Sequence, residues 1–113
     1  MQSLKDLIPS LIEATEKKRL VWSKHEWGGF VTDLDAFRLR TWEWEDEASQ
    51  EIKGISVCLL NGSTLMDEVV SSEFGPEHPM LKELHSAARR SALKVESAIE
   101  KLQAALGKLT ATP

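Results

Sequence analysis

The chain has 113 residues, of which 42% are hydrophobic and 28% are charged, and its formal net charge is −4. This size and composition predict one soluble globular domain with a single core. The acidic balance argues against a nucleic-acid binder, because such a protein needs a basic face to neutralise phosphates.

Neither a membrane span nor an oxidised compartment is indicated. No apolar run approaches the roughly 20 residues that a membrane helix needs, and residues 1–6 lack the apolar segment and cleavage site of a secretion signal. The lone cysteine, Cys58, cannot form an internal disulfide. The sequence therefore predicts a cytoplasmic protein.

A helical pattern opens the chain. Apolar residues at three- and four-residue spacing predict a short helix with one buried stripe, made by Leu4, Leu7, Ile8, Leu11 and Ile12. Pro9 interrupts this pattern, because proline lacks a backbone donor and clashes with the preceding turn. Two interpretations are open: the helix begins near Pro9, or it is longer and kinked there.

From Leu20 onward the apolar period changes from 3.6 to 2, which predicts strands. A first strand over 20–24 carries Trp22, and a glycine turn at 27–29 leads to a second strand over 30–34. A tight turn at 33–36 precedes a third strand over 37–44. The acidic residues 45–51 predict a solvated loop, and the apolar run 55–60 predicts a central fourth strand.

A hairpin signal follows this fourth strand. Asn61-Gly62 favours a tight turn, because both residues tolerate positive φ. The returning strand is predicted over 64–72. A three-residue loop, pairing Leu59 with Leu65 and Ile55 with Val69, gives the most apolar register and is the one we favour.

The C-terminal third predicts one long amphipathic helix from about 79 to 106, with Pro79 in its first turn and Gly107 as its C-cap. Its length of about 42 Å exceeds the radius of gyration of about 13 to 14 Å expected for this chain length. Its far end is therefore expected to lie along a wide sheet or to contact another chain. Its stripe comprises Leu81, Leu84, Ala88, Ala92, Val95, Ile99, Leu102 and Leu106.

Together these elements predict an α+β fold. It consists of a short N-terminal helix, an antiparallel meander of about five strands, and a long C-terminal helix, with both helices on one face of the sheet. We expect a single domain over residues 1–109 and a frayed tail over 110–113.

The third predicted strand contains a conflict in its pattern. Its residues Phe37 and Leu39 share one face, whereas Trp42 and Trp44 share the other face with Arg38 and Arg40. A β-bulge near residues 40–41 would return both tryptophans to the core, and this is the interpretation we favour. The alternative is an outer-face patch of tryptophan and arginine, a composition typical of partner-binding sites.

No catalytic, metal-binding or cofactor-binding motif is present. The three histidines lack a metal-ligand spacing, because His78 and His85 lie about 10 Å apart on a helix. His85 is expected at the edge of the apolar stripe, and Cys58 is expected to pack rather than react. An enzyme would need polar residues assembled from distant positions, such as His25, Asp33 and Glu68.

The layout resembles a group of small uncharacterised bacterial α+β proteins. These share a leucine-rich first helix, a tryptophan on the first strand, a glycine hairpin, and a helix with leucines followed by alanine-arginine. The resemblance supports the fold and implies no activity. Here the matching residues are 7–12, Trp22, Asn61-Gly62, Leu81, Leu84 and Ala88-Arg89.

Two functions are compatible with these patterns. The first, which we prefer, is a non-catalytic interaction or assembly module without cofactors, which binds a protein partner or a second copy of itself. Its self-association residues would be Val95, Ile99, Leu102 and Leu106, with the tryptophan–arginine patch as the partner-binding surface. The alternative is a small-molecule cup between sheet and helices, lined by Trp22, Phe30, Phe37 and Cys58.

Overall fold

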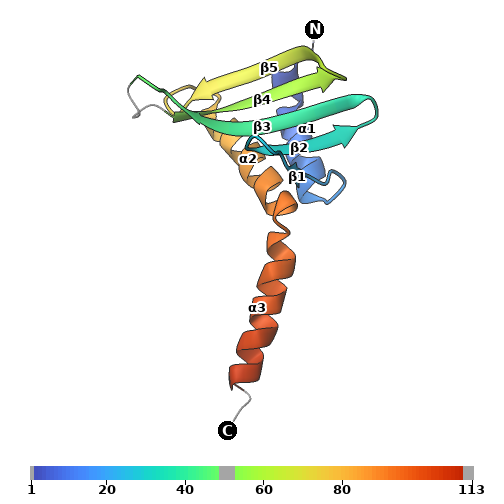
Figure 1. The fold of residues 1–113 in the computed structure, drawn as a ribbon, viewed down its shortest axis with the longest axis vertical. Coiled ribbons are helices and arrows are strands. Elements are labelled where there is room, and N and C mark those ends of the chain that lie inside the picture. Colours follow the sequence, from blue (N-terminus) through green and yellow to red (C-terminus); the bar gives the residue numbers. More distant parts are fainter. Residues whose placement is uncertain (1, 49–52, 111–113) are drawn as a thin grey trace.

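The computed structural model describes residues 2–48 and 53–110, and its fold confirms the predicted α+β class. Helix α1 is followed by a five-stranded antiparallel meander with the strand order β1-β2-β3-β4-β5, and then by two helices (Figure 1). The elements are α1 (Leu4–Glu16), β1 (Ser23–Lys24), β2 (Phe30–Leu34), β3 (Phe37–Glu45), β4 (Lys53–Asn61), β5 (Thr64–Ser72), α2 (His78–Ala92) and α3 (Val95–Thr110).

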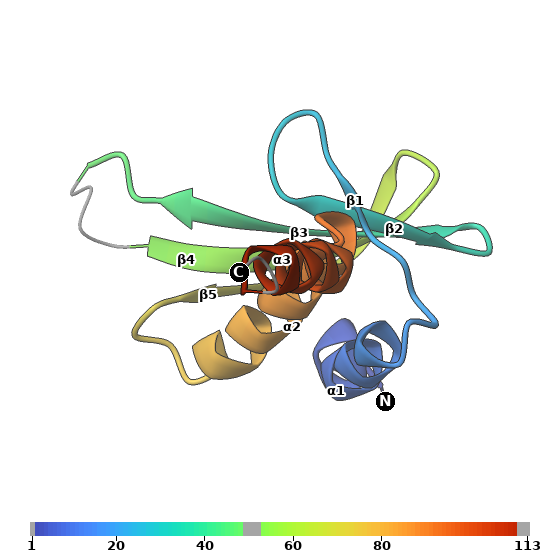
Figure 2. The same cartoon turned by 90° about the horizontal axis from the view of Figure 1, so that it is seen from below.

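The core lies between one face of the sheet and the two helices α1 and α2, which both cover that face (Figure 2). Leu81, Leu84 and Ala88 of α2 are fully buried, as predicted for the first half of the long stripe. They pack with Ile8 of α1 and Val57 of β4. We call α1, the sheet and α2 together the body.

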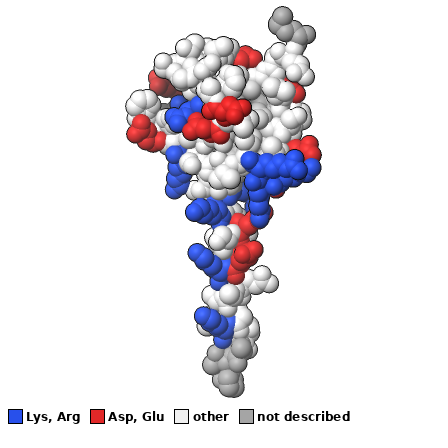
Figure 3. Space-filling view, turned by 90° about the vertical axis from the view of Figure 1, so that its right-hand side faces the viewer, with Lys and Arg blue, Asp and Glu red and all other residues white. Residues whose placement is uncertain are grey.

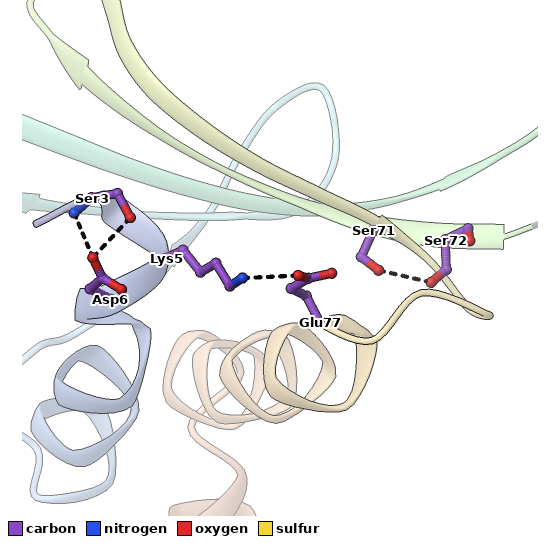
Figure 4. A network of polar contacts seen from close by, with 6 residues as sticks. All are labelled: Ser3, Lys5, Asp6, Ser71, Ser72 and Glu77. Carbon is purple, nitrogen blue, oxygen red and sulfur yellow. Dashed lines mark hydrogen bonds and ion pairs between the residues drawn. The ribbon is translucent and has the colours of Figure 1, made fainter.

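Helix α1 begins before Pro9, so a start near Pro9 is wrong. The Asp6 carboxylate accepts hydrogen bonds from the Ser3 backbone N–H (2.9 Å) and hydroxyl (3.1 Å), a reciprocal cap that fixes the first turn (Figure 4). Lys5 forms an ion pair with Glu77, just ahead of α2, at 3.0 Å (Figure 4). This exposed pair lies where the start of α1 faces the start of α2.

Trp22 lies before β1 rather than on it, because β1 contains only Ser23 and Lys24. Its indole ring is nonetheless in the core with 2% exposure, and its Nε1 donates a hydrogen bond to Thr15 Oγ1 at 2.9 Å. Its backbone N–H donates to Ser91 Oγ of α2. The residue therefore connects both helices to the first strand.

The predicted register of the β4–β5 hairpin is wrong. Asn61 pairs with Thr64 across a two-residue loop, and a bulge at Met66 follows, because Leu60 pairs with Leu65 but Leu59 with Asp67. Beyond the bulge Val57, rather than Ile55, pairs with Val69. Beyond the bulge the register differs from the predicted one by two residues, which preserves the face of each side chain, so the apolar pattern of that part does not select between the two registers.

The predicted single long helix is also wrong, because it breaks at Leu93 and Lys94. Lys94 has a φ of 52°, and its backbone N–H donates to the carbonyl of Ser91. This left-handed residue ends α2 and redirects the chain into α3, which leaves the body (Figure 1). The core ends at the same place, since no residue of α3 is buried.

Two smaller expectations also change at the ends of elements. Gly107 is not a C-cap, because α3 continues through it to Thr110. Thr110, the first residue of the predicted 110–113 tail, is therefore helical, and the rest of that tail lies outside the described residues. The acidic loop begins later than predicted, because Glu45 still belongs to β3 and pairs with Lys53. The rest of that loop from residue 49 also lies outside the described residues.

Candidate functional site

Helix α3, which we call the arm, presents an exposed apolar surface outside the body. None of its 16 residues is buried. Beyond Val95, the large apolar side chains of its stripe are at least half exposed: Ile99 by 51%, Leu102 by 59% and Leu106 by 52%. Leu109, at 74% exposure, extends the predicted stripe by one more turn. Of the predicted self-association residues, Val95 is half-buried where the arm meets the body. The arm is therefore an amphipathic helix whose apolar stripe is uncovered in the described structure.

An ion pair fixes the root of the arm to the body. Lys18 Nζ, just after α1, lies 2.7 Å from Glu96 Oε2. The pair lowers the pKa of the Glu96 carboxyl and raises that of Lys18, and nearby Glu100 adds to the latter effect. In Figure 3, basic and acidic side chains mark different sides of the arm. This exposed ion pair contacts α3 at Glu96 and does not cover its apolar stripe.

The bulge we favoured in β3 is wrong, and the four tryptophan and arginine residues stay together on one face of the sheet. Within the described strands, β3 pairs with β4 without a shift from Phe37–Asn61 to Glu45–Lys53. The side chains of Arg38, Arg40, Trp42 and Trp44 therefore share the sheet face opposite the helices, which we call the outer face.

Two glycines make room for the tryptophans on the outer face. Gly54 lies opposite Trp44, and a Cβ at Gly54 would collide with the indole ring. Gly29, with a φ of 78°, lies close to β3 at the Thr41 carbonyl oxygen and at the Cβ and Cα of Trp42. Both tryptophans are consequently half-buried without entering the core.

The arginines of the patch are engaged within the protein. Arg38 pairs with Asp33 through two hydrogen bonds of 2.7 and 3.2 Å, which lower the pKa of Asp33. The Arg40 guanidinium carbon lies 4.6 Å above the Trp42 ring centroid, and Nη2 donates to the Gly28 carbonyl oxygen at 2.9 Å. The two Arg40 contacts hold the 25–29 loop against the outer face. The Trp27 side chain, at 81% exposure, projects from this loop.

The four residues of the predicted cup do not meet. Trp22 is in the core and Phe30 packs against the His85 ring on the helix side, whereas Cys58 shares the outer face with its pair Arg40. Phe37 is 42% exposed at the end of β3. Burial and nearby Glu68 raise the pKa of the Cys58 thiol, as fits a packing role.

His85, predicted at the boundary of the stripe, is a buried polar residue with 7% exposure. Its Nε2 lies 3.1 Å from the Glu43 carboxylate and its Nδ1 lies 3.0 Å from Thr41 Oγ1. In the neutral ring, Nε2–H donates to Glu43 and the Thr41 hydroxyl donates to Nδ1. This polar contact joins α2 to β3, and sequence reasoning missed it because its partners are 42 and 44 positions away.

This contact predicts a pH dependence of stability. Burial lowers the pKa of His85 below its ordinary 6.5, Arg89 acts in the same direction, and Glu43 opposes them. The unfolded chain therefore binds a proton at a higher pH than the folded chain. Stability should fall as the pH drops from about 7 through the pKa of the folded state, by at most about 1.4 kcal/mol per pH unit.

Urea unfolding at pH 7.5, 6.5 and 5.5 measures this effect. The variant H85N should lose the slope in that range, while the carboxylates with lowered pKa values act only at lower pH. An unchanged slope in H85N would assign the effect to another group.

The remaining polar positions do not form a chemical centre. Asp33 of β2 and Glu68 of β5 lie three strands apart, and His25 lies in the turn after β1. Among the described residues, no three histidine, cysteine or acidic side chains are grouped so that they could hold a metal ion. Within the same residues, no helix is long and apolar enough to cross a membrane.

Comparison with protein-family models, with curated proteins and with solved structures gives no match for this chain.

Proposed function

We propose that this protein is a non-catalytic cytoplasmic assembly module that self-associates through its arm. The observation that supports the proposal is the uncovered stripe of α3, in which Ile99, Leu102, Leu106 and Leu109 are each at least half exposed beyond a well-packed body. The outer face, with Trp27 projecting from it, is the surface proposed for a protein partner. The cytoplasm remains the proposed compartment because the only cysteine is a buried free thiol.

An estimate of the apolar energy shows what kind of association to expect. Full burial of a leucine or isoleucine is worth about 1.5 to 3 kcal/mol. Covering the exposed half of Ile99, Leu102, Leu106 and Leu109 in each of two copies would therefore contribute about 6 to 12 kcal/mol. Association itself costs about 4 to 15 kcal/mol. The two ranges overlap, so we expect a dimer that dissociates on dilution.

Light scattering during size exclusion, over a hundredfold range of concentration, tests the proposal. We expect the mass to rise from 12.7 kDa toward twice that value. The variant L102E places a charge in the stripe and should remain monomeric at least tenfold above the concentration at which the wild type associates. Its body should unfold at an unchanged urea concentration, because Leu102 contacts no core.

A matched variant controls for the added charge. Ala104 lies one half-turn from the stripe, so A104E introduces the same carboxylate on the opposite side of the arm. It should associate like the wild type. A wild type that stays monomeric throughout, or an L102E variant that associates normally, would overturn the proposal.

A further inference from the structure

The apolar stripe of the arm has a defined direction around the helix. At 100° per residue, Ile99, Leu102, Leu106 and Leu109 lie within about 40° of one line. Ala105 lies about 80° to one side of that line and Gln103 about 80° to the other. The spacing of the stripe alternates between three and four residues, which is the repeat of paired helices. The arm therefore presents one narrow seam suited to one partner helix.

The placement of the body decides how two such seams can meet. Figure 2, which looks along the arm, shows the body extending on all sides of α3. The molecule measures 38 and 26 Å across its two shorter axes, whereas paired helices lie only about 8 to 10 Å apart. If two arms paired in parallel orientation, their two bodies would overlap sterically. Arms in opposite directions place the bodies at opposite ends.

We propose that two copies of this chain pair through their arms in antiparallel orientation, with Ile99 opposite Leu109 and Leu102 opposite Leu106 of the second copy. This inference rests on the proposed function and specifies its geometry. In this register all four exposed apolar side chains of each arm enter the seam. Val95, which is already half-buried at the body, stays outside it.

The small and polar residues beside the seam fit the same register. Ala105 meets Ala105 of the second copy along one edge, and the absence of longer side chains there lets the helices approach closely. Gln103 meets Gln103 along the other edge, where two amides can hydrogen-bond. Lys101 and Lys108 of opposite copies lie at similar height, but about 120° or more from the centre of the seam, where salt screens them.

Single-cysteine cross-linking in a C58A background tests the orientation. Each variant carries one cysteine and is oxidised with copper phenanthroline at a concentration where light scattering shows association. A105C should form disulfide-linked dimers at least tenfold faster than A104C, its neighbour on the far side of the arm. V95C should also react slowly, because the two Val95 positions lie at opposite ends of an antiparallel pair.

The outcomes separate this inference from the proposed function. Fast reaction of V95C would mean parallel arms, which overturns the orientation and leaves self-association standing. If all three variants react equally slowly in an associated sample, the two copies contact each other away from the arm. That result would overturn both the antiparallel orientation and self-association through the arm. A sample that stays monomeric by light scattering overturns self-association itself. Fast reaction of A105C alone, in an associated sample, supports both.

Discussion

Replacing Leu84 with alanine should lower the free energy of unfolding by about 2 to 5 kcal/mol, the cost of removing a large side chain from a packed core. Leu84 has no exposed surface, and it joins Ile8, Val57 and Leu81 where α1, α2 and the sheet meet. Because small domains have only about 5 to 15 kcal/mol of stability, L84A should unfold at a much lower urea concentration, measured by circular dichroism.

The control for this prediction is the same substitution on the arm. Leu109 is 74% exposed, so L109A should change the stability of the body by less than about 0.5 kcal/mol. Measurements are made on dilute protein, so that association does not contribute. Comparable losses in L84A and L109A would mean that the core is not where the fold places it.

Replacing Gly29 with alanine should cost about 2 to 5 kcal/mol, more than the same change at Gly28. Both glycines have positive φ, 78° at Gly29 and 100° at Gly28. A Cβ at Gly29 would collide with the Thr41 carbonyl oxygen and lie 2.7 Å from the Trp42 Cβ. Relief would require β2 and β3 to move apart, which strains the strand pairing.

Gly28 provides the matched control, because nothing lies within 4 Å of the Cβ that alanine would add there. G28A should cost only the left-handed conformation, about 1 to 2 kcal/mol. Urea unfolding of the two variants measures the difference directly. If G28A and G29A lose the same stability, contact with β3 is not what requires glycine at position 29.

The order of the elements could be predicted because its signals are local. The spacing of apolar residues in α1 and α2 follows one helical face, and Asn61-Gly62 marks the hairpin between β4 and β5. The break at Lys94 could not be predicted. The three- and four-residue spacing continues through it from Ala92 to Val95 and Ile99, and neither glycine nor proline marks the turn.

The outer face shows a second limit of sequence patterns. The sequence favours core positions for Trp42 and Trp44, and hence a bulge, because tryptophan is mostly buried. In the structure, Trp42 lies close to Gly29 and the Trp44 ring packs against Gly54, and both glycines come from neighbouring segments. That relation depends on strand register, which the alternation of residues along one strand does not contain. The unshifted register of β3 with β4 excludes the bulge and keeps both tryptophans on the outer face.

The link between α1 and β5 has a consequence for how the folded protein avoids aggregation. Strand β5 is a nine-residue edge of the sheet, and an open edge of that length can recruit strands from other molecules. Here the Leu4 backbone N–H donates to the Asp67 carboxylate at 2.9 Å, beside the Met66 bulge. The bulge distorts the edge, and the first turn of α1 lies beside it through this hydrogen bond. Leu4 is itself a core residue, so loss of that turn would weaken the body and at the same time remove a contact that sits at its edge strand.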